Sequence, residues 1–289
     1  MTDRAKCIRH ARTLLFVPGA RPDRFDRAVA TAAELVVVDL EASVRPADKA
    51  SARAALLGWL PTCAAAHRVL VRINSANSPW FAEDVAALSA ASCAGIVLPM
   101  ALSAARVAAA IAVLPPALPV VALIETAAGI LDAARIATVP GVVRLAFGNM
   151  DYATDTGTRG RDSMIHPSAI LVMASRAAQL PSPIAGVTAA FRDLAKLEDE
   201  AVWERDQGFG AKFCIHPEQL PIVARAFTPT AAELAWARRV LAAADGSYAF
   251  ELDGELVDRP VVERAHRLVA AMGVDGASHG TGDETQGER

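Results

Sequence analysis

The stretch that decides the fold runs from residue 120 to residue 151 and reads VVALIETAAGILDAARIATVPGVVRLAFGNMD. Two short apolar runs, 120–124 and 143–147, stand on either side of an Ala-rich segment with helical spacing. Continuous apolar runs separated by helices are typical of parallel strands covered on both faces. The stretch therefore predicts a strand–helix–strand unit, with a carboxylate after each strand: Glu125 and then Asp151.

The same alternation recurs through residues 12–226. Helical spacing in segments such as 24–33 and 104–113 separates further apolar runs at 14–17, 35–39, 69–73, 95–98, 183–187 and 211–215. Eight strand–helix units fit an α/β TIM (β/α)8 barrel better than a doubly wound sheet. The first strand is followed by a single glycine, Gly19, and not by the G-x-G-x-x-G of a dinucleotide-binding fold.

A smaller block, residues 227–272, follows the predicted barrel. Its predicted elements are a helix at 230–244, a hairpin at 250–257 around Asp253 and Gly254, and a last helix at 260–272. The block is too small for a core of its own, so we expect a helix-hairpin-helix lid on its own barrel or on a neighbouring subunit. Residues 273–289 are polar and Gly-rich, which predicts a disordered tail.

Composition narrows the class of protein. Hydrophobic residues are 53% of the 289 and charged residues 21%, so a large core is available. The formal net charge of -3 gives no bulk attraction to nucleic acid or to an anionic membrane. No apolar stretch has the length of a membrane span or of a signal-peptide core. Cysteines without metal-ligand spacing predict reduced thiols in a cytoplasmic protein: Cys7, Cys63, Cys93 and Cys214.

Polar side chains stand at the predicted carboxyl ends of at least five strands, where a TIM barrel has its active site. They are Arg21, Asp39, Glu41, Arg72, Asn74, Glu125, Asp151 and His216. A buried carboxylate is costly unless its charge is compensated. Two carboxylates with substrate oxygens and waters are what Mg²⁺ prefers, so Glu125 and Asp151 are the candidate metal ligands. Alternatively, each caps a following helix or pairs with a surface arginine.

The remaining polar residues allow more than one interpretation. Arg72 can hold a substrate carboxylate, stabilise an enolate oxygen, or neutralise Asp39 or Glu41 inside the barrel. Arg21 can contact a phosphate or carboxylate, or be a surface charge. We interpret His216 as a core histidine bonded to backbone. The charges interpreted as helix-surface residues are Glu34, Lys49 and Arg53.

At these residues the sequence resembles the citrate lyase beta-subunit-like family, with its malyl-CoA and citramalyl-CoA lyases and the wider hydroxy-keto-acid aldolases. The resemblance extends from about residue 12 to about residue 272. The matching motifs are LFVPGARP at 15–22, VDLE at 38–41, VRIN at 71–74, IVLP at 96–99, ALIET at 122–126, FGNMD at 147–151, KFCIHPEQ at 212–219, FTP at 227–229 and LVDRP at 256–260.

The resemblance implies a TIM barrel that assembles as a homotrimer or a pair of trimers. It implies Mg²⁺ on Glu125 and Asp151, and contact between Arg72 and the acyl or enolate oxygen of the substrate. Asp258 matches a lid residue that serves some lyases as acid/base from a neighbouring subunit; without the family it reads as a helix-start residue. The expected substrate-binding residues are Arg21, Glu41 and Asn74.

Three departures from the family pattern stand out. Ala42 replaces an Asp after the second strand, Met100 replaces a Lys after the fourth, and Ala185 replaces an Asp in the seventh. We expect each to remove a charged group near the barrel mouth. This predicts a retained metal site with altered substrate contacts, or a chain that has lost the ordinary lyase activity.

The resulting functional expectation is a Mg²⁺-dependent carbon–carbon lyase. It would cleave or form a 3-hydroxyacyl-CoA such as malyl-CoA or citramalyl-CoA, giving a keto acid and acetyl-CoA through an enolate stabilised by the metal and Arg72. The expected partner is therefore a small acyl-CoA or keto or hydroxy acid. Two alternatives stay open: an acyl-CoA thioesterase that uses the same site, and a non-catalytic component of a lyase complex.

Overall fold

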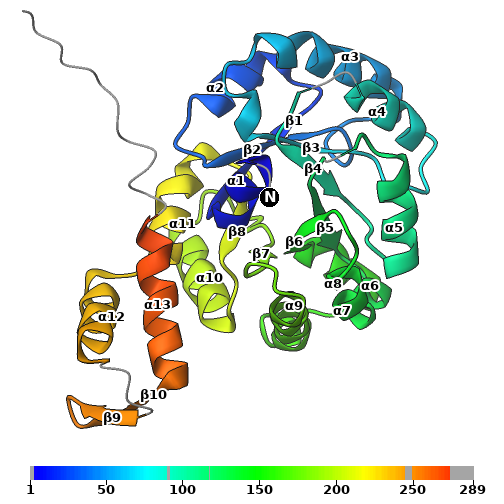
Figure 1. Cartoon of the computed structure of the whole chain (residues 1–289). Helices are drawn as coiled ribbons and strands as arrows, with labels where there is room; N and C mark the ends of the chain where they lie inside the picture. Colours follow the sequence, from blue (N-terminus) through cyan, green and yellow to red (C-terminus); the bar gives the residue numbers. More distant parts are fainter. Residues whose placement is uncertain (1–2, 90–91, 117, 245–248, 274–289) are drawn as a thin grey trace, which may run out of the picture. The chain divides into compact units, whose positions relative to one another are not determined.

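The computed structural model describes residues 3–89, 92–116, 118–244 and 249–273 (Figure 1). The chain divides into two compact units, residues 1–227 and 228–289. The first unit carries all the predicted site residues except Asp258, which belongs to the second.

The first unit is a closed barrel of eight parallel strands in sequence order, as predicted (Figure 1). β8 pairs with β1, so the sheet has no open edge. This confirms the predicted TIM barrel. The strands are β1 (Thr13–Pro18), β2 (Leu35–Asp39), β3 (Val69–Arg72), β4 (Gly95–Leu98), β5 (Val120–Ile124), β6 (Val142–Phe147), β7 (Ile184–Ala185) and β8 (Ala211–Cys214).

Helices follow the strands and cover the outside of the barrel (Figure 1). The α-helices are α2 (Phe25–Val29), α3 (Lys49–Trp59), α4 (Phe81–Leu88), α5 (Ala104–Val113), α6 (Ala127–Leu131), α7 (Ala133–Ile136), α8 (Asn149–Thr156), α9 (Ile165–Ala177), α10 (Leu194–Gln207) and α11 (Leu220–Phe227). Short 3-10 turns are η1 (Pro22–Arg24), η2 (Pro46–Asp48), η3 (Leu60–Thr62), η4 (Ala66–Arg68), η5 (Asp162–Met164) and η6 (Pro217–Gln219). The helix predicted at 24–33 is shorter, because α2 ends at Val29. Within the described residues, no helix is long and apolar enough to cross a bilayer.

Alternation along the strands decides which side chains reach the barrel mouth. In β2, Leu35 and Val37 belong to the cluster inside the barrel, whereas Val36 and Val38 pack in the layer under the helices. The same period in β5 puts Val121 and Leu123 inside. Because side chains alternate between the two faces of a strand, the next inward position is Asp39 in one strand and Glu125 in the other. The apolar pattern therefore directs both carboxylates to the barrel axis.

An N-terminal helix, α1 (Asp3–His10), was not predicted and contributes to the barrel core. Ile8 is fully buried and belongs to the inner cluster. Arg144 of β6 is 2% exposed; its Nη1 donates to the carbonyl oxygens of Ile8 and Ala11 at 2.9 and 2.6 Å, and its Nε to that of Ser182 at 2.9 Å. One buried guanidinium thus satisfies three carbonyl groups and ties α1 to β6.

The second unit contains α12 (Ala231–Ala243), the hairpin β9 (Ala249–Leu252) and β10 (Glu255–Asp258), and α13 (Arg259–Gly273). Asp253 and Gly254 have φ of 55° and 83°, the left-handed values that a two-residue hairpin turn requires. The expectation that this block lacks a core is wrong, since it buries a small cluster of its own: Ala237, Val240, Val257 and Ala265. The predicted disordered tail lies outside the described residues, except for Gly273.

We expect Arg144→Met to lower the free energy of unfolding by about 3 kcal/mol or more, because three buried carbonyl groups lose their donor. Urea unfolding followed by circular dichroism measures this change. Arg135→Met is the matched control, since the Arg135 side chain is 77% exposed and its removal should cost less than about 0.5 kcal/mol. Equal losses for the two variants would show that Arg144 does not hold α1 in place.

Candidate active site

A pocket opens at the carboxyl ends of the barrel strands. Its apolar wall consists of Phe16, Leu123, Phe147, Val187 and Phe213. Its polar residues are Arg72, Glu125, Asn149 and Asp151, which come from β3, from the end of β5 and from the start of α8. The structure therefore brings together both predicted metal ligands and the predicted catalytic arginine in one pocket.

Arg72 is held in a two-point ion pair with Asp39. Its Nε lies 2.7 Å from Asp39 Oδ1 and its Nη2 2.8 Å from Asp39 Oδ2, while Nη1 lies 3.5 Å from Glu41 Oε2. The ring centroid of Phe16 is 4.7 Å from the guanidinium carbon. Burial alone would raise the pKa of Asp39, but the hydrogen bonds and charge of Arg72 hold it below its ordinary value. Both groups are therefore charged, and the guanidinium has a fixed plane.

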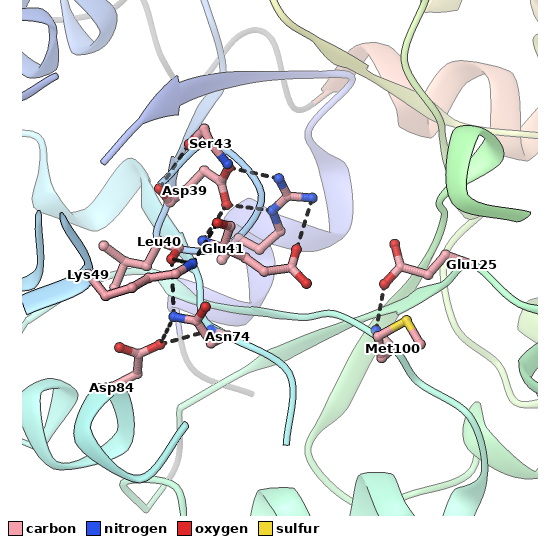
Figure 2. A network of polar contacts seen from close by, with 10 residues as sticks. Asp39, Leu40, Glu41, Ser43, Lys49, Asn74, Asp84, Met100 and Glu125 are labelled. Atoms are coloured by element: carbon pink, nitrogen blue, oxygen red, sulfur yellow. Dashed lines mark hydrogen bonds and ion pairs between the residues drawn. The ribbon is translucent and has the colours of Figure 1, made fainter. Parts of the chain in front are cut away.

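Glu125 follows β5 and is 3% exposed. Its Oε1 accepts a hydrogen bond from the backbone N–H of Met100 at 2.6 Å (Figure 2). Met100 has φ of 53°, a left-handed value that is uncommon for a residue with a side chain. A Cβ on Gly148 would lie 2.4 Å from Glu125 Cβ and 2.7 Å from its Oε2, so only glycine fits there. Two neighbouring loops are thus shaped around this carboxylate.

The pocket carries an excess of negative charge. Burial raises the pKa of Glu125 to about 8, and the charges of Glu41 and Asp151 add to the rise against the hydrogen bond from Met100. Burial also raises the pKa of Glu41, with Asp39 and Asp151 contributing. A cation placed among these carboxylates would lower the cost of keeping them ionised.

The donor set fits a magnesium ion that takes part of its coordination from elsewhere. In the part of the chain that the structure describes, no group of three or more His, Cys, Asp or Glu side chains is arranged to hold a metal. A cation here would use Glu125 and Asp151, with substrate oxygens and waters as its other ligands. Mg²⁺ is commonly held by one or two carboxylates in this way.

The structure separates the predicted substrate-binding residues from the pocket wall. Arg21 is exposed and forms hydrogen bonds with Asp23 at 2.7 and 2.9 Å. Asn74 is 2% exposed, and its Nδ2 donates to Asp84 and to the carbonyl of Leu40 at 2.7 and 3.1 Å. Glu41 reaches the site through its ion pair with Arg72. The roles of Arg21, Glu41 and Asn74 in substrate binding stay predictions.

Asp258 ends β10 in the second unit, and its Oδ1 accepts the backbone N–H of Val261 at 3.4 Å. This is the contact of a helix-start residue, one of the two interpretations that the sequence allowed. Its acid/base role stays a prediction.

Several interpretations of charged residues were wrong. Lys49 and Arg53 are 6% and 9% exposed and not surface charges, because Lys49 bonds to the turn after β2 and Arg53 pairs with Asp84 of α4. His216 is not a core histidine: its side chain is 38% exposed, although its Nδ1 does accept the backbone N–H of Glu218 at 3.3 Å.

The expectation that Ala185 removes a charged group near the barrel mouth is also wrong. Ala185 packs between the barrel and its helices, so its side chain does not face the mouth.

Asn149 is a site residue that the sequence analysis did not single out. Its Nδ2 donates to the Val187 carbonyl at 3.0 Å, and its Oδ1 accepts the Val187 N–H at 3.1 Å. A Cβ on Gly186 would lie 2.0 Å from that Oδ1, so the amide needs a glycine beside it. Asn149 therefore joins the ends of β6 and β7. Its position in the sequence between Gly148 and Asp151 could have identified it as a site residue.

We expect Glu125→Gln to raise the melting temperature at pH 8 by roughly 5 °C in the presence of a chelator, with little change at pH 5. The folded pKa of Glu125, about 8, lies above its ordinary 4.5, so the unfolded carboxyl ionises first and stability falls as pH rises between these values. The neutral amide removes this loss. Differential scanning calorimetry with Glu198→Gln, an exposed control, measures it; a pH-independent difference would contradict the argument.

Comparison with known proteins gives a consistent assignment. Residues 12–217 match the HpcH/HpaI aldolase/citrate lyase family. The chain is 35% identical over 263 residues to a (3S)-malyl-CoA thioesterase of Cereibacter sphaeroides, covering 90% of this chain and 92% of that protein. It is 38% identical over 271 residues to a citrate lyase subunit beta-like protein of Mycobacterium tuberculosis, covering 90% and 94%.

Solved structures agree in fold. The CitE protein of Mycobacterium tuberculosis in complex with magnesium, acetoacetate and coenzyme A aligns with a TM-score of 0.80 at 35% identity, covering 92% of this chain and 99% of that one. A citrate lyase beta subunit from the same organism, complexed with oxaloacetate and magnesium, aligns with a TM-score of 0.68 at 34% identity, covering 77% and 99%. The chain belongs to the HpcH/HpaI aldolase/citrate lyase family.

Proposed function

We propose that this protein is a Mg²⁺-dependent carbon–carbon lyase acting on a 3-hydroxyacyl-CoA such as malyl-CoA or citramalyl-CoA. The observation that carries the proposal is the single pocket in which Glu125 and Asp151 face Arg72. A set of carboxylates for a cation, beside a fixed guanidinium, suits a reaction that develops negative charge on a substrate oxygen. The Mg²⁺ and coenzyme A in the CitE complex support this choice of cofactor and substrate class.

In the cleavage direction, the bond between the hydroxyl-bearing carbon and the carbon next to the thioester breaks. The proposed acid/base Asp258 takes the proton of the hydroxyl, which becomes the carbonyl of a keto acid, and the other fragment leaves as the enolate of acetyl-CoA. Bound at Glu125 and Asp151, Mg²⁺ would supply Lewis-acid polarisation of the oxygen that becomes the carbonyl. Arg72, whose plane Asp39 fixes, would stabilise the enolate oxygen.

The enolate carbon must then receive a proton, and the proposed donor is Asp258. The apolar wall of Phe16, Leu123 and Phe213 keeps the reacting atoms in surroundings with few competing hydrogen-bond partners. Among the described residues that line the pocket, Arg72 is the only cationic side chain. Arg72 and the metal would therefore together neutralise the negative charge of the substrate and of the enolate.

A second candidate is an acyl-CoA thioesterase that uses the same site. The relative named (3S)-malyl-CoA thioesterase favours it. Here water is added across the thioester bond, and the products are free CoA and the intact hydroxy acid. Glu125, Asp151 and Arg72 would keep the same tasks, since a thioester oxygen also gains negative charge when water attacks its carbon.

The products distinguish the two reactions. We expect incubation with Mg²⁺ and malyl-CoA or citramalyl-CoA to give a keto acid and acetyl-CoA, identified by mass spectrometry, and Glu125→Gln to lose this turnover. Free CoA with the hydroxy acid would instead establish the thioesterase. No Mg²⁺-dependent turnover of either compound would contradict both reactions on these substrates and favour a non-catalytic member of a lyase complex.

Arg72→Lys tests the guanidinium separately from its charge. Because lysine cannot make the two-point contact with Asp39, we expect kcat/KM to fall about 100-fold or more, chiefly in kcat. Steady-state kinetics on the substrate identified above measures the loss, with circular dichroism as the control for folding. A change confined to KM would mean that Arg72 binds substrate without stabilising the enolate.

A further inference from the structure

Lys49 is a buried cation without an evident reason in the fold itself. It is the first residue of α3 and is 6% exposed. The amino end of a helix carries partial positive charge, so an ammonium is on the unfavourable side of the helix dipole. Lysine is also rarely buried in proteins, because its charge loses hydration. Such a departure from the usual pattern is expected where a residue serves the site.

The contacts of Lys49 are directed at the turn that follows β2. Its Nζ donates to the carbonyl oxygens of Leu40 and Glu41, both at 2.7 Å (Figure 2). The same Nζ lies 5.2 Å from the centroid of the Trp80 ring, which adds a cation–π contact. One ammonium thus holds two successive carbonyl groups and fixes the backbone of the turn.

A second buried group supports the same turn. Asn74 Nδ2 donates to the Leu40 carbonyl at 3.1 Å and to Asp84 Oδ2 at 2.7 Å, and its backbone N–H donates to that oxygen at 2.8 Å. Asp84 is 1% exposed and its Oδ1 accepts from Arg53 Nε at 2.9 Å. The turn is therefore tied through buried side chains to α3 and α4, as Figure 2 shows for its inner part.

Glu41 is the residue of this turn that reaches Arg72. With its carbonyl held by Lys49, its carboxylate lies 3.5 Å from Arg72 Nη1. Its backbone N–H donates to Asp39 Oδ1 at 2.9 Å. The position of one turn thus sets the Glu41 carboxylate beside Arg72, which lines the pocket.

We propose that Lys49 is a positioning residue of the active site: by holding the carbonyls of Leu40 and Glu41, it sets the Glu41 carboxylate against Arg72, which lines the pocket together with the candidate metal ligands. This rests on the proposed function in that the site it orders is the one proposed for Mg²⁺. Loss of a contact that orients a residue near a metal typically weakens metal binding by about 10- to 100-fold.

Calorimetric titration of the full chain with Mg²⁺ tests the role without requiring turnover. Lys49→Met keeps the apolar stem against Trp80 and removes the charge and its donors. We expect its Mg²⁺ affinity to fall about 10-fold. Removing a positive charge near a metal site would by itself tighten binding, so unchanged or tighter binding overturns the proposal. Lys196→Met, an exposed lysine 3.8 Å from Glu200, is the matched control and should bind Mg²⁺ as the unaltered chain does.

A cycle with Glu41→Gln separates positioning from a general effect on the fold. If Lys49 acts through the Glu41 carboxylate, Lys49→Met should change Mg²⁺ affinity little in the Glu41→Gln background, while its effect on melting temperature persists. An equal loss of affinity in both backgrounds overturns the proposal. Lys49→Arg keeps the charge but alters the donor geometry, so several-fold weaker binding is expected. If Lys49→Met does not fold, Lys49→Arg decides: unchanged affinity overturns the proposal.

If the unaltered chain binds no Mg²⁺, the proposed function falls and the role of Lys49 with it. If the unaltered chain binds Mg²⁺ and Lys49→Met binds it equally well, the role of Lys49 alone is rejected.

Discussion

The burial of carboxylates at the mouth of an apolar barrel is the constraint on which the rest of the site depends. Glu125 is almost fully covered, and its pKa rises because burial and neighbouring carboxylates disfavour its charge. The chain accommodates it with a backbone N–H from Met100, held at a left-handed φ, and with Gly148, where no side chain would fit. The remaining cost of this buried charge disfavours the metal-free fold and favours one that contains a cation.

Arg72 and Asp39 supply the fixed part of this arrangement. Their two-point ion pair is nearly buried, so each charge depends on the other and neither can turn away without loss. Glu41 then adds a carboxylate whose position follows from the turn after β2. Lys49 and Asn74 connect that turn to the outer helices, which makes the helix layer part of the site and not merely a cover for the barrel.

The sequence predicted the barrel well because its signals are local. All eight strands lie where continuous apolar runs stand, and α5 and α12 directly follow Ser103 and Thr230, whose side chains accept the hydrogen bonds that start a helix. It missed α1, which has few apolar residues and is stabilised by burying Ile8 and by Arg144. The expectation that Glu125, Asp151 and Arg72 lie at the same end of the barrel followed from the rule that the carboxyl ends of the strands converge there, and all three line one pocket.

What the sequence determined by itself is therefore the two-residue period that points Asp39, Arg72 and Glu125 inward, and the glycines that leave room beside them. Only the tertiary structure decided that Lys49 and Arg53 are buried, that His216 is partly exposed and that Ala185 faces the helices. The reason is physical: a helix position or a strand end looks the same in sequence whether its side chain meets water or a loop from a distant segment. That choice is made by packing between residues far apart in the chain.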